Sequence, residues 1–225
     1  RSSINTGEYE SIIIGNRDGD AVRAQTAVTD ARAYNRALSA EEIRAIYNLR
    51  KPVERPEGLL FWQHPEYVRN SVAYSGQPMR YAGTWLSSSY NGVSYSEFNG
   101  SPMQYTKAKA EYSLANLQNT ITFGCWLYVS ELTGSVQCVI GDAQSGGFCF
   151  YVTGNRGDAT FGLRTLLKTQ NSSGYATITS TTNKGTGVWT HVAVTYDGAV
   201  FSVYVDCVLA GQQALDGTIT YGTNS

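Results

Sequence analysis

The chain has 225 residues, a formal net charge of −1 and only 16% charged residues. It has no cluster of lysine and arginine, which excludes the phosphate-neutralising surface that nucleic-acid binding requires and leaves membrane attraction unsupported. No run approaches the roughly 18 apolar residues of a membrane-spanning helix. We therefore expect one domain with a sizeable core and, because Arg1 is not an initiator Met, a processed or excised piece.

Short β-rich segments follow one another along the chain. Period-two or apolar β-branched patterns, bounded by Gly, Asn, Asp and Ser, occupy residues 9–14, 27–34, 59–63, 94–98, 121–129, 136–140, 148–153, 176–180, 190–196 and 201–209. Few helical patterns separate them, which excludes a parallel α/β sheet. The pattern predicts an all-β antiparallel two-sheet sandwich, in which each strand buries one face.

One short helix interrupts this pattern at residues 39–47. Ser39 and Glu42 have the spacing of a capping box, and a narrow apolar stripe follows them, so we expect the helix to pack against a sheet. Residues 48–57 contain two prolines and five charged residues. This composition predicts an exposed linker.

Several segments resemble the laminin-G-like branch of the concanavalin-A-like lectin and glucanase superfamily. The stretch GVWTHVAVTYDGAVFSVYVDCVLAG, residues 187–211, resembles the signature hairpin of that superfamily, with Cys207 where Gly is usual. The stretch VTDARAYNRALSAEEIRAIY, residues 28–47, resembles its closing strand and helix. GLLFW, FNG and ITFGCWLYV resemble its opening strands. The resemblance implies a jelly-roll sandwich in which Trp126 and Trp189 are largely buried.

The order of these segments is circularly shifted, because the closing segment comes first. Residues 1–47 would supply the closing strands and helix, and residues 58–225 the main body. In a circular permutant, the N-terminal segment completes its own sandwich. In a tandem array or fibre, it completes a neighbouring unit by strand exchange. The sequence leaves both arrangements open.

The sequence contains no pattern typical of catalysis. Glycosidases of this fold need two closely spaced carboxylates, and no strand of the E-x-D-x-E type occurs. Glu8 and Glu10 alternate, but solvent-facing carboxylates explain them. His64 and His191 have no companion nucleophile or metal-ligand spacing. We expect no enzyme.

Two loops carry oxygen-rich side chains. Residues 15–20 contain Asn16, Asp18 and Asp20, and residues 141–147 contain Asp142 and Gln144. Carboxylate and carbonyl oxygens are the ligands that calcium prefers. In position, both loops resemble those from which pentraxin members of the superfamily donate calcium ligands, which implies that they meet on one sheet face. Ordinary turns use the same residue types, and the arginine between Asn16 and Asp18 would repel a cation.

Aromatic residues crowd the Ser- and Gly-rich region between residues 81 and 105. Trp85, Tyr90 and Tyr95 are the candidate ligand-binding residues, because exposed rings of this kind can stack on sugars. Core packing explains several of the rings in this region equally well.

The four cysteines indicate only weakly whether the chain belongs to an oxidising, extracellular compartment. Cys138 and Cys149 flank a turn-like stretch, and a hairpin that pairs Ile140 with Gly147 would place them opposite each other, near disulfide geometry. For Cys125 and Cys207 we favour the interpretation of small core residues.

These observations predict an extracellular binding or adhesion module, secreted or on a cell or virion surface. Its expected ligand is a glycan or a surface protein, with calcium as the one candidate cofactor. The alternative is a structural unit that assembles by strand exchange. A glycoside hydrolase is a distant third hypothesis.

Overall fold

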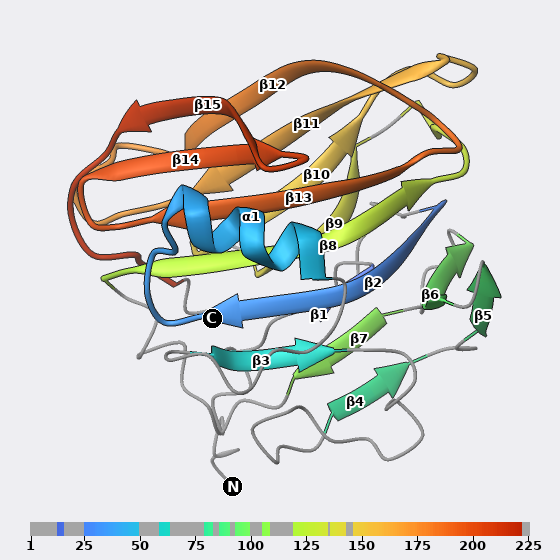
Figure 1. Ribbon diagram of the computed structural model, residues 1–225. Helices are drawn as coiled ribbons and strands as arrows, with labels where there is room; N and C mark the ends of the chain where they lie inside the picture. The colour runs from blue at the N-terminus through green and yellow to red at the C-terminus, as the bar shows by residue number, and fades with distance from the viewer. Residues whose placement is uncertain are drawn as a thin grey trace, which may run out of the picture.

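The computed structural model describes residues 13–15, 25–49, 59–63, 79–82, 86–90, 93–99, 105–108, 119–134, 136–142 and 146–221. These residues form two antiparallel sheets and one short helix, α1 (Ala40–Leu49), as Figure 1 shows. Sheet A contains, in spatial order, β12 (Ala176–Gly185), β11 (Thr160–Leu167), β10 (Phe148–Thr153), β9 (Gln137–Asp142), β1 (Ile13–Ile14), β7 (Tyr105–Ala108) and β4 (Met79–Ala82). Sheet B contains β15 (Val208–Ala214), β14 (Val200–Val205), β13 (Trp189–Tyr196), β8 (Ile121–Val129), β2 (Gln25–Tyr34), β6 (Val93–Asn99) and β5 (Leu86–Tyr90), and β3 (Leu59–Gln63) pairs with β2. The predicted antiparallel sandwich with one short helix is confirmed.

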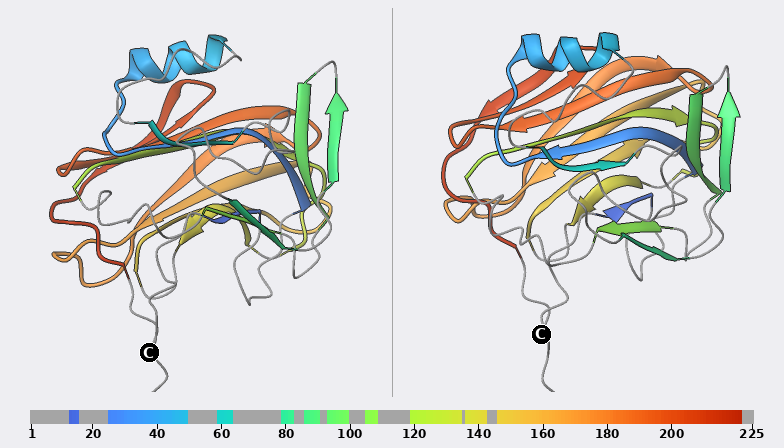
Figure 2. Two further views of the ribbon diagram at one scale, coloured as in Figure 1. Left: turned by 90° about the horizontal axis from the view of Figure 1, so that it is seen from below. Right: turned by 60° about the horizontal axis from the view of Figure 1, so that its bottom comes forward.

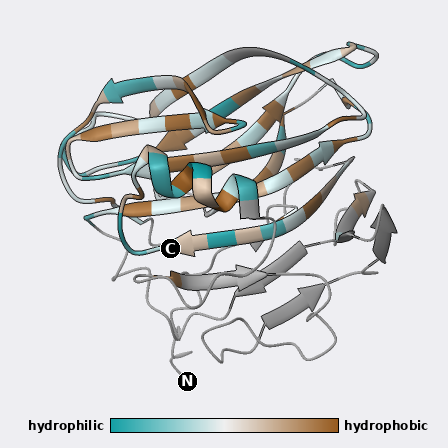
Figure 3. Cartoon of the chain, viewed as in Figure 1, coloured by the Kyte–Doolittle hydropathy of each residue, from teal (hydrophilic) through white to brown (hydrophobic). Residues whose placement is uncertain are grey.

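The main core lies between the two sheets. Strand β8 shows how the sequence builds it, because Phe123, Cys125 and Leu127 face the core at every second position. Phe123 stacks on Phe148 of sheet A with ring centroids 4.8 Å apart. Alternating hydropathy along β8 and β13 of sheet B is visible in the colours of Figure 3. Each fully buried side chain of this size stabilises the fold by roughly 1.5–3 kcal/mol.

Strand β2, from the N-terminal segment, lies inside sheet B between β8 and β6. Its first half pairs with β6, from Gln25 to Val28, and its second half pairs with β3, from Ala31 to Tyr34. The change of partner falls at Asp30, which has a φ of 54° and occupies a bulge against β8. A left-handed conformation is uncommon for a residue other than glycine, and here the bulge requires it.

Helix α1 lies on the outer face of sheet B, on the side away from sheet A (Figure 2). The predicted capping box is confirmed: the Ser39 amide donates to Glu42 Oε2 over 2.8 Å, and the Glu42 amide donates to Ser39 Oγ over 3.3 Å. Ile43 packs against Tyr34, Leu38 and other residues of a second apolar cluster. The helix continues to Leu49, two residues beyond its predicted end, so residues 48 and 49 of the predicted linker are helical. The rest of that linker lies outside the described residues.

The C-terminal part of the chain corrects one prediction. The predicted strand 201–209 is two strands, β14 and β15, which are joined by a two-residue turn at Asp206 and Cys207. Both residues have positive φ, 46° and 59°, as a type I′ turn requires.

Candidate functional site

Aromatic side chains occupy the part of the outer face of sheet B that lies beside the C-terminal end of α1. Strand alternation places Trp126 and Tyr128 of β8 on this face, since their neighbours Cys125 and Leu127 face the core. In β13 the same face carries Trp189 and His191. The register pairs Trp189 with Tyr128 and His191 with Trp126. The rings therefore form two adjacent rows, two residues or about 7 Å apart along the strands.

Four aromatic side chains on this side of sheet B are partly exposed: Tyr47 of α1, Tyr95 of β6, Tyr128 and Trp189. We call them the aromatic face. Trp189 lies 5.5 Å from Tyr128 and 5.5 Å from Tyr95 between ring centroids. Tyr47 stacks on the buried Trp126 at 5.2 Å. Three strands and the helix thus bring their rings to one surface.

A small residue explains how Tyr95 reaches Trp189 across β2. Ala27 of β2 is paired with Tyr128 on one side and with Glu97 of β6 on the other. It is buried, and its methyl group leaves room above the sheet for the larger rings. A bulky residue at this position would separate Tyr95 from Trp189.

Polar groups border the aromatic face at the turn between β14 and β15. Asp206 accepts a hydrogen bond from the His191 amide over 2.9 Å and forms an ion pair with Lys184 of β12. Both charged side chains are partly exposed. Strand β13 begins at Trp189, three residues before Val192, which pairs with the last residue of β14. The charged pair therefore lies beside His191, two residues along β13 from Trp189.

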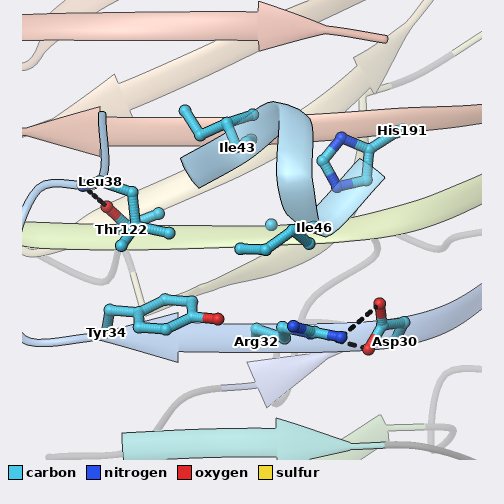
Figure 4. A pocket seen from close by; sticks show the side chains of 10 residues that line it. Asp30, Arg32, Tyr34, Leu38, Ile43, Ile46, Thr122 and His191 are labelled. Atoms are coloured by element: carbon cyan, nitrogen blue, oxygen red, sulfur yellow. Dashed lines mark hydrogen bonds and ion pairs between the residues drawn. The ribbon is translucent and has the colours of Figure 1, made fainter. Parts of the chain in front are cut away.

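The cavity under α1 has a different character (Figure 4). It has a volume of about 10 Å³, room for about one water molecule, and is lined on the sheet side by Asp30, Arg32, Thr122 and His191. Asp30 and Arg32 form a buried ion pair with contacts of 2.8 and 3.0 Å. Burial by itself would lower the pKa of Arg32, but the Asp30 carboxylate raises it above its ordinary value. The cavity is too small for a sugar.

His191, which lies between α1 and sheet B, has a strongly lowered pKa. Burial lowers its pKa to about 4, against a smaller opposing effect of Asp206. Its ring makes edge contacts with Trp126 at 5.3 Å and Tyr47 at 5.7 Å. Within the described residues, its Nδ1 atom has no hydrogen-bond partner. The ring is therefore neutral near pH 7 and acts as part of the packing.

The structure places only part of the candidate ligand-binding residues. Tyr95 belongs to the aromatic face, Tyr90 ends β5 with a side chain outside the described part, and Trp85 lies outside the described residues. The sequence analysis missed Tyr47, Tyr128 and Trp189. The expectation that Trp126 is largely buried is confirmed, at 8% exposure, and Trp189 has an intermediate exposure, with part of its ring at the surface. The alternation of inward and outward residues along β8 and β13 could have revealed Tyr128 and Trp189.

The candidate calcium ligands are for the most part outside the described residues: Asn16, Asp18, Asp20 and Gln144. Asp142 is the last residue of β9. Strands β1 and β9 are antiparallel, with Ile13 opposite Gly141, and the Gly15 amide donates to the Val139 carbonyl. The chain therefore leaves β1 and β9 toward opposite ends of the pair. The described residues contain no group of three or more metal-ligating side chains, and the calcium site stays a prediction.

The cysteine register differs from the expected one. Phe148 pairs with Asp142, so Cys149 lies opposite Gly141, and a bulge places Cys138 opposite Tyr151. All four cysteines are free thiols in the structure. The Sγ atoms of Cys138 and Cys149 are nevertheless only 3.2 Å apart.

The two antiparallel sheets, with one helix on the outer face of sheet B, form the jelly-roll type of sandwich that the sequence predicts. A family model described as the concanavalin A-like lectin/glucanases superfamily matches residues 99–225, and the chain belongs to this family. The searches of curated proteins and of solved structures found no match to the chain. In the described part of the chain, no helix has the length and apolar character needed to cross a membrane.

Proposed function

We propose that this chain is a non-catalytic extracellular binding module that recognises a glycan through its aromatic face. The observation that carries the proposal is the contact of Trp189 with Tyr128 and Tyr95, three partly exposed rings from three strands. Single exposed hydrophobic side chains are common on protein surfaces, whereas a contiguous exposed group of them often marks an interaction site. Their faces can stack on the apolar faces of sugar rings.

The chemistry at the border of this face also supports a glycan. Sugars present hydroxyl groups around an apolar ring face, so a site needs charged or polar partners beside aromatic ones. Lys184 of β12 and Asp206 of the β14–β15 turn are ion-paired with each other but partly exposed, so a sugar hydroxyl could bond to either without breaking the pair. A protein ligand would gain the same stacking, but the small extent of the aromatic face favours a small, ring-shaped ligand.

Two features support binding rather than catalysis. Asp30 and Asp206 are the carboxylates that lie beside His191, and each is engaged in an ion pair, with Arg32 and with Lys184. Neither is a free general acid or nucleophile of the kind that a glycosidase needs. The neutral, buried His191 has no access to a substrate on the aromatic face.

A glycan array followed by calorimetric titration of the strongest glycan tests the proposal. Trp189→Ala should weaken binding about tenfold or more, equivalent to roughly 1.4 kcal/mol, because it removes the central ring of the face. Tyr128→Phe keeps the ring and should retain most of the affinity. Thermal melting of each variant must show that the fold is intact at the temperature of the titration.

The matched control is Tyr175→Ala, which removes a partly buried tyrosine from the outer face of sheet A, on the other side of the sandwich. Its affinity should equal that of the wild type. Equal losses in Trp189→Ala and Tyr175→Ala, or no glycan bound on the array, would rule out the aromatic face as the site.

A structural role by strand exchange is the second candidate function. The observation that favours it is the position of β2, which lies outside the residues matched by the family model and yet in the middle of sheet B. The same pairing could be made by the N-terminal segment of a neighbouring copy, which would produce a fibre or layer. The solution mass separates the two candidates.

A further inference from the structure

A second cluster of interest lies on the outer face of sheet A, separated from the aromatic face by the whole sandwich. It contains Cys138 of β9 and Cys149 and Tyr151 of β10, all buried outside the main core. Leu166, Tyr175 and Val136 pack around them. This cluster plays no part in the glycan proposal, and inference about it is independent of that proposal.

The backbone explains why the two sulfur atoms meet. Val139 and Ile140 form a bulge in β9 and both face the core, so that Cys138 and Gly141 both face outward. Cys149 lies opposite Gly141, where a Cβ atom would approach the Cys149 Sγ to 2.7 Å. The missing side chain gives the Cys149 sulfur space to lie along the strand pair toward Cys138. The resulting Sγ–Sγ distance of 3.2 Å is about 1 Å longer than a disulfide bond.

The surrounding side chains shield this pair from solvent. Cys138 and Cys149 are 2% and 1% exposed. The Tyr175 hydroxyl donates to the Gly146 carbonyl over 3.1 Å, which holds its ring beside the turn that joins β9 and β10. In the closed hairpin this shield slows exchange with soluble thiols and with soluble disulfides alike, so the bridge would form while the hairpin is open or still folding.

We propose that Cys138 and Cys149 are a disulfide-forming modification site that covalently links the bulged β9–β10 hairpin. The reaction needs an oxidant of the class of low-molecular-weight disulfides. One protein thiolate attacks the oxidant and releases one small thiol, leaving a mixed disulfide. The second protein thiolate then attacks the protein sulfur of this bond and releases the second small thiol, so that two protons and two electrons leave the protein.

The other cysteines lack such a partner. Cys125 is fully buried in the main core, and burial raises the pKa of its thiol well above the usual range, which makes it unreactive. Cys207 lies at the β14–β15 turn and packs on the outer side of sheet B, with the second apolar cluster. Cys125 and Cys207 lie on opposite faces of sheet B and do not form a bridge with each other. A count of the thiols that remain after oxidation therefore identifies the Cys138–Cys149 bridge.

The experiment uses the full chain with Cys207→Ser, which removes the partly exposed thiol. The protein is unfolded and refolded in oxidised and reduced glutathione, so that the oxidant reaches both thiols, and is then denatured without reductant, alkylated and weighed by mass spectrometry. One alkylated thiol is expected, at Cys125, together with a linked peptide pair that contains Cys138 and Cys149. Three alkylated thiols, or a linkage that includes Cys125, would overturn the proposal.

Two further measurements support the assignment. Reductant should lower the melting temperature of the oxidised protein by roughly 5–10 °C, because the bridge restricts the unfolded chain. It should leave the Cys138→Ser/Cys149→Ser double variant unchanged. Tyr175→Ala should accelerate reduction of the native protein, since it removes the cover. A melting temperature that is equally sensitive to reductant in the double variant would contradict the assignment.

Discussion

His191 lies on the outer face of sheet B, where the rings of Trp126 and Tyr47 and helix α1 exclude water from it. Its pKa falls to about 4 because burial disfavours the charged ring; Asp206 raises the pKa and Arg32 lowers it further, both to a smaller extent. The unfolded chain takes up a proton near pH 6.5, whereas the folded protein does so only near pH 4. The stability that the neutral His191 contributes is therefore fully present above pH 6.5, and this contribution is lost as the pH falls from 6.5 toward 4.

Denaturant titrations at a series of pH values should detect this loss. Between pH 6.5 and 4.5 the wild type should lose about 2 kcal/mol of unfolding free energy, and His191→Phe, which keeps a ring but cannot titrate, should have a nearly flat profile. In the folded protein Glu42 titrates below this pH range, because the hydrogen bond with Arg36 lowers its pKa. The control His64→Gln removes the only other histidine and should keep the wild-type slope. An unchanged slope in His191→Phe would contradict the assignment.

Cys207 is the second residue whose local conformation has a measurable consequence. Its φ of 59° belongs to the left-handed region, where a side chain costs about 1–2 kcal/mol and glycine is free of that cost. Cys207→Gly should raise the melting temperature by about 1–3 °C, since the greater freedom of glycine in the unfolded chain offsets part of the gain. Cys207→Ala removes the sulfur but keeps the strain, so it should show no such rise. A lower melting temperature for Cys207→Gly would mean that the packing of the sulfur outweighs the strain.

At the scale of elements, local signals in the sequence were sufficient for the strands that bury one apolar face. The predicted bounds of β3, β8 and β10 agree with the structure, and the capping box located the start of α1. Strand β11 escaped prediction because its inward and outward residues do not follow polarity. Thr165 is fully buried, while the adjacent Leu166 faces outward.

Register was less predictable than strand position, because it depends on bulges. Asp30 and the Val139–Ile140 pair each add a residue to one strand, and no local pattern marks either one. The same limit applies to the aromatic face. Tyr95 and Trp189 are distant in the sequence and meet only because β6, β2, β8 and β13 lie side by side in sheet B.

At the scale of the whole molecule, the shifted order of segments has a simple geometric basis. By the resemblance, β2 is the expected closing strand of the usual order and β3 the expected opening strand, and these two are antiparallel neighbours in sheet B. Figure 1 shows β3 beside β2, with α1 following β2 along the chain. We infer that the N-terminal segment completes its own sandwich. It thereby contributes Tyr47 and the Ala27 floor to the aromatic face.

The mass of the chain in solution tests this closure most directly. Light scattering over a hundredfold range of concentration should give one species of about 24.5 kDa, the mass of one chain, because each molecule buries its own β2. Intramolecular pairing has the higher effective concentration and should persist on dilution. Stable multimers, with masses at multiples of the single chain and unchanged by dilution, would contradict the account and favour strand exchange between copies.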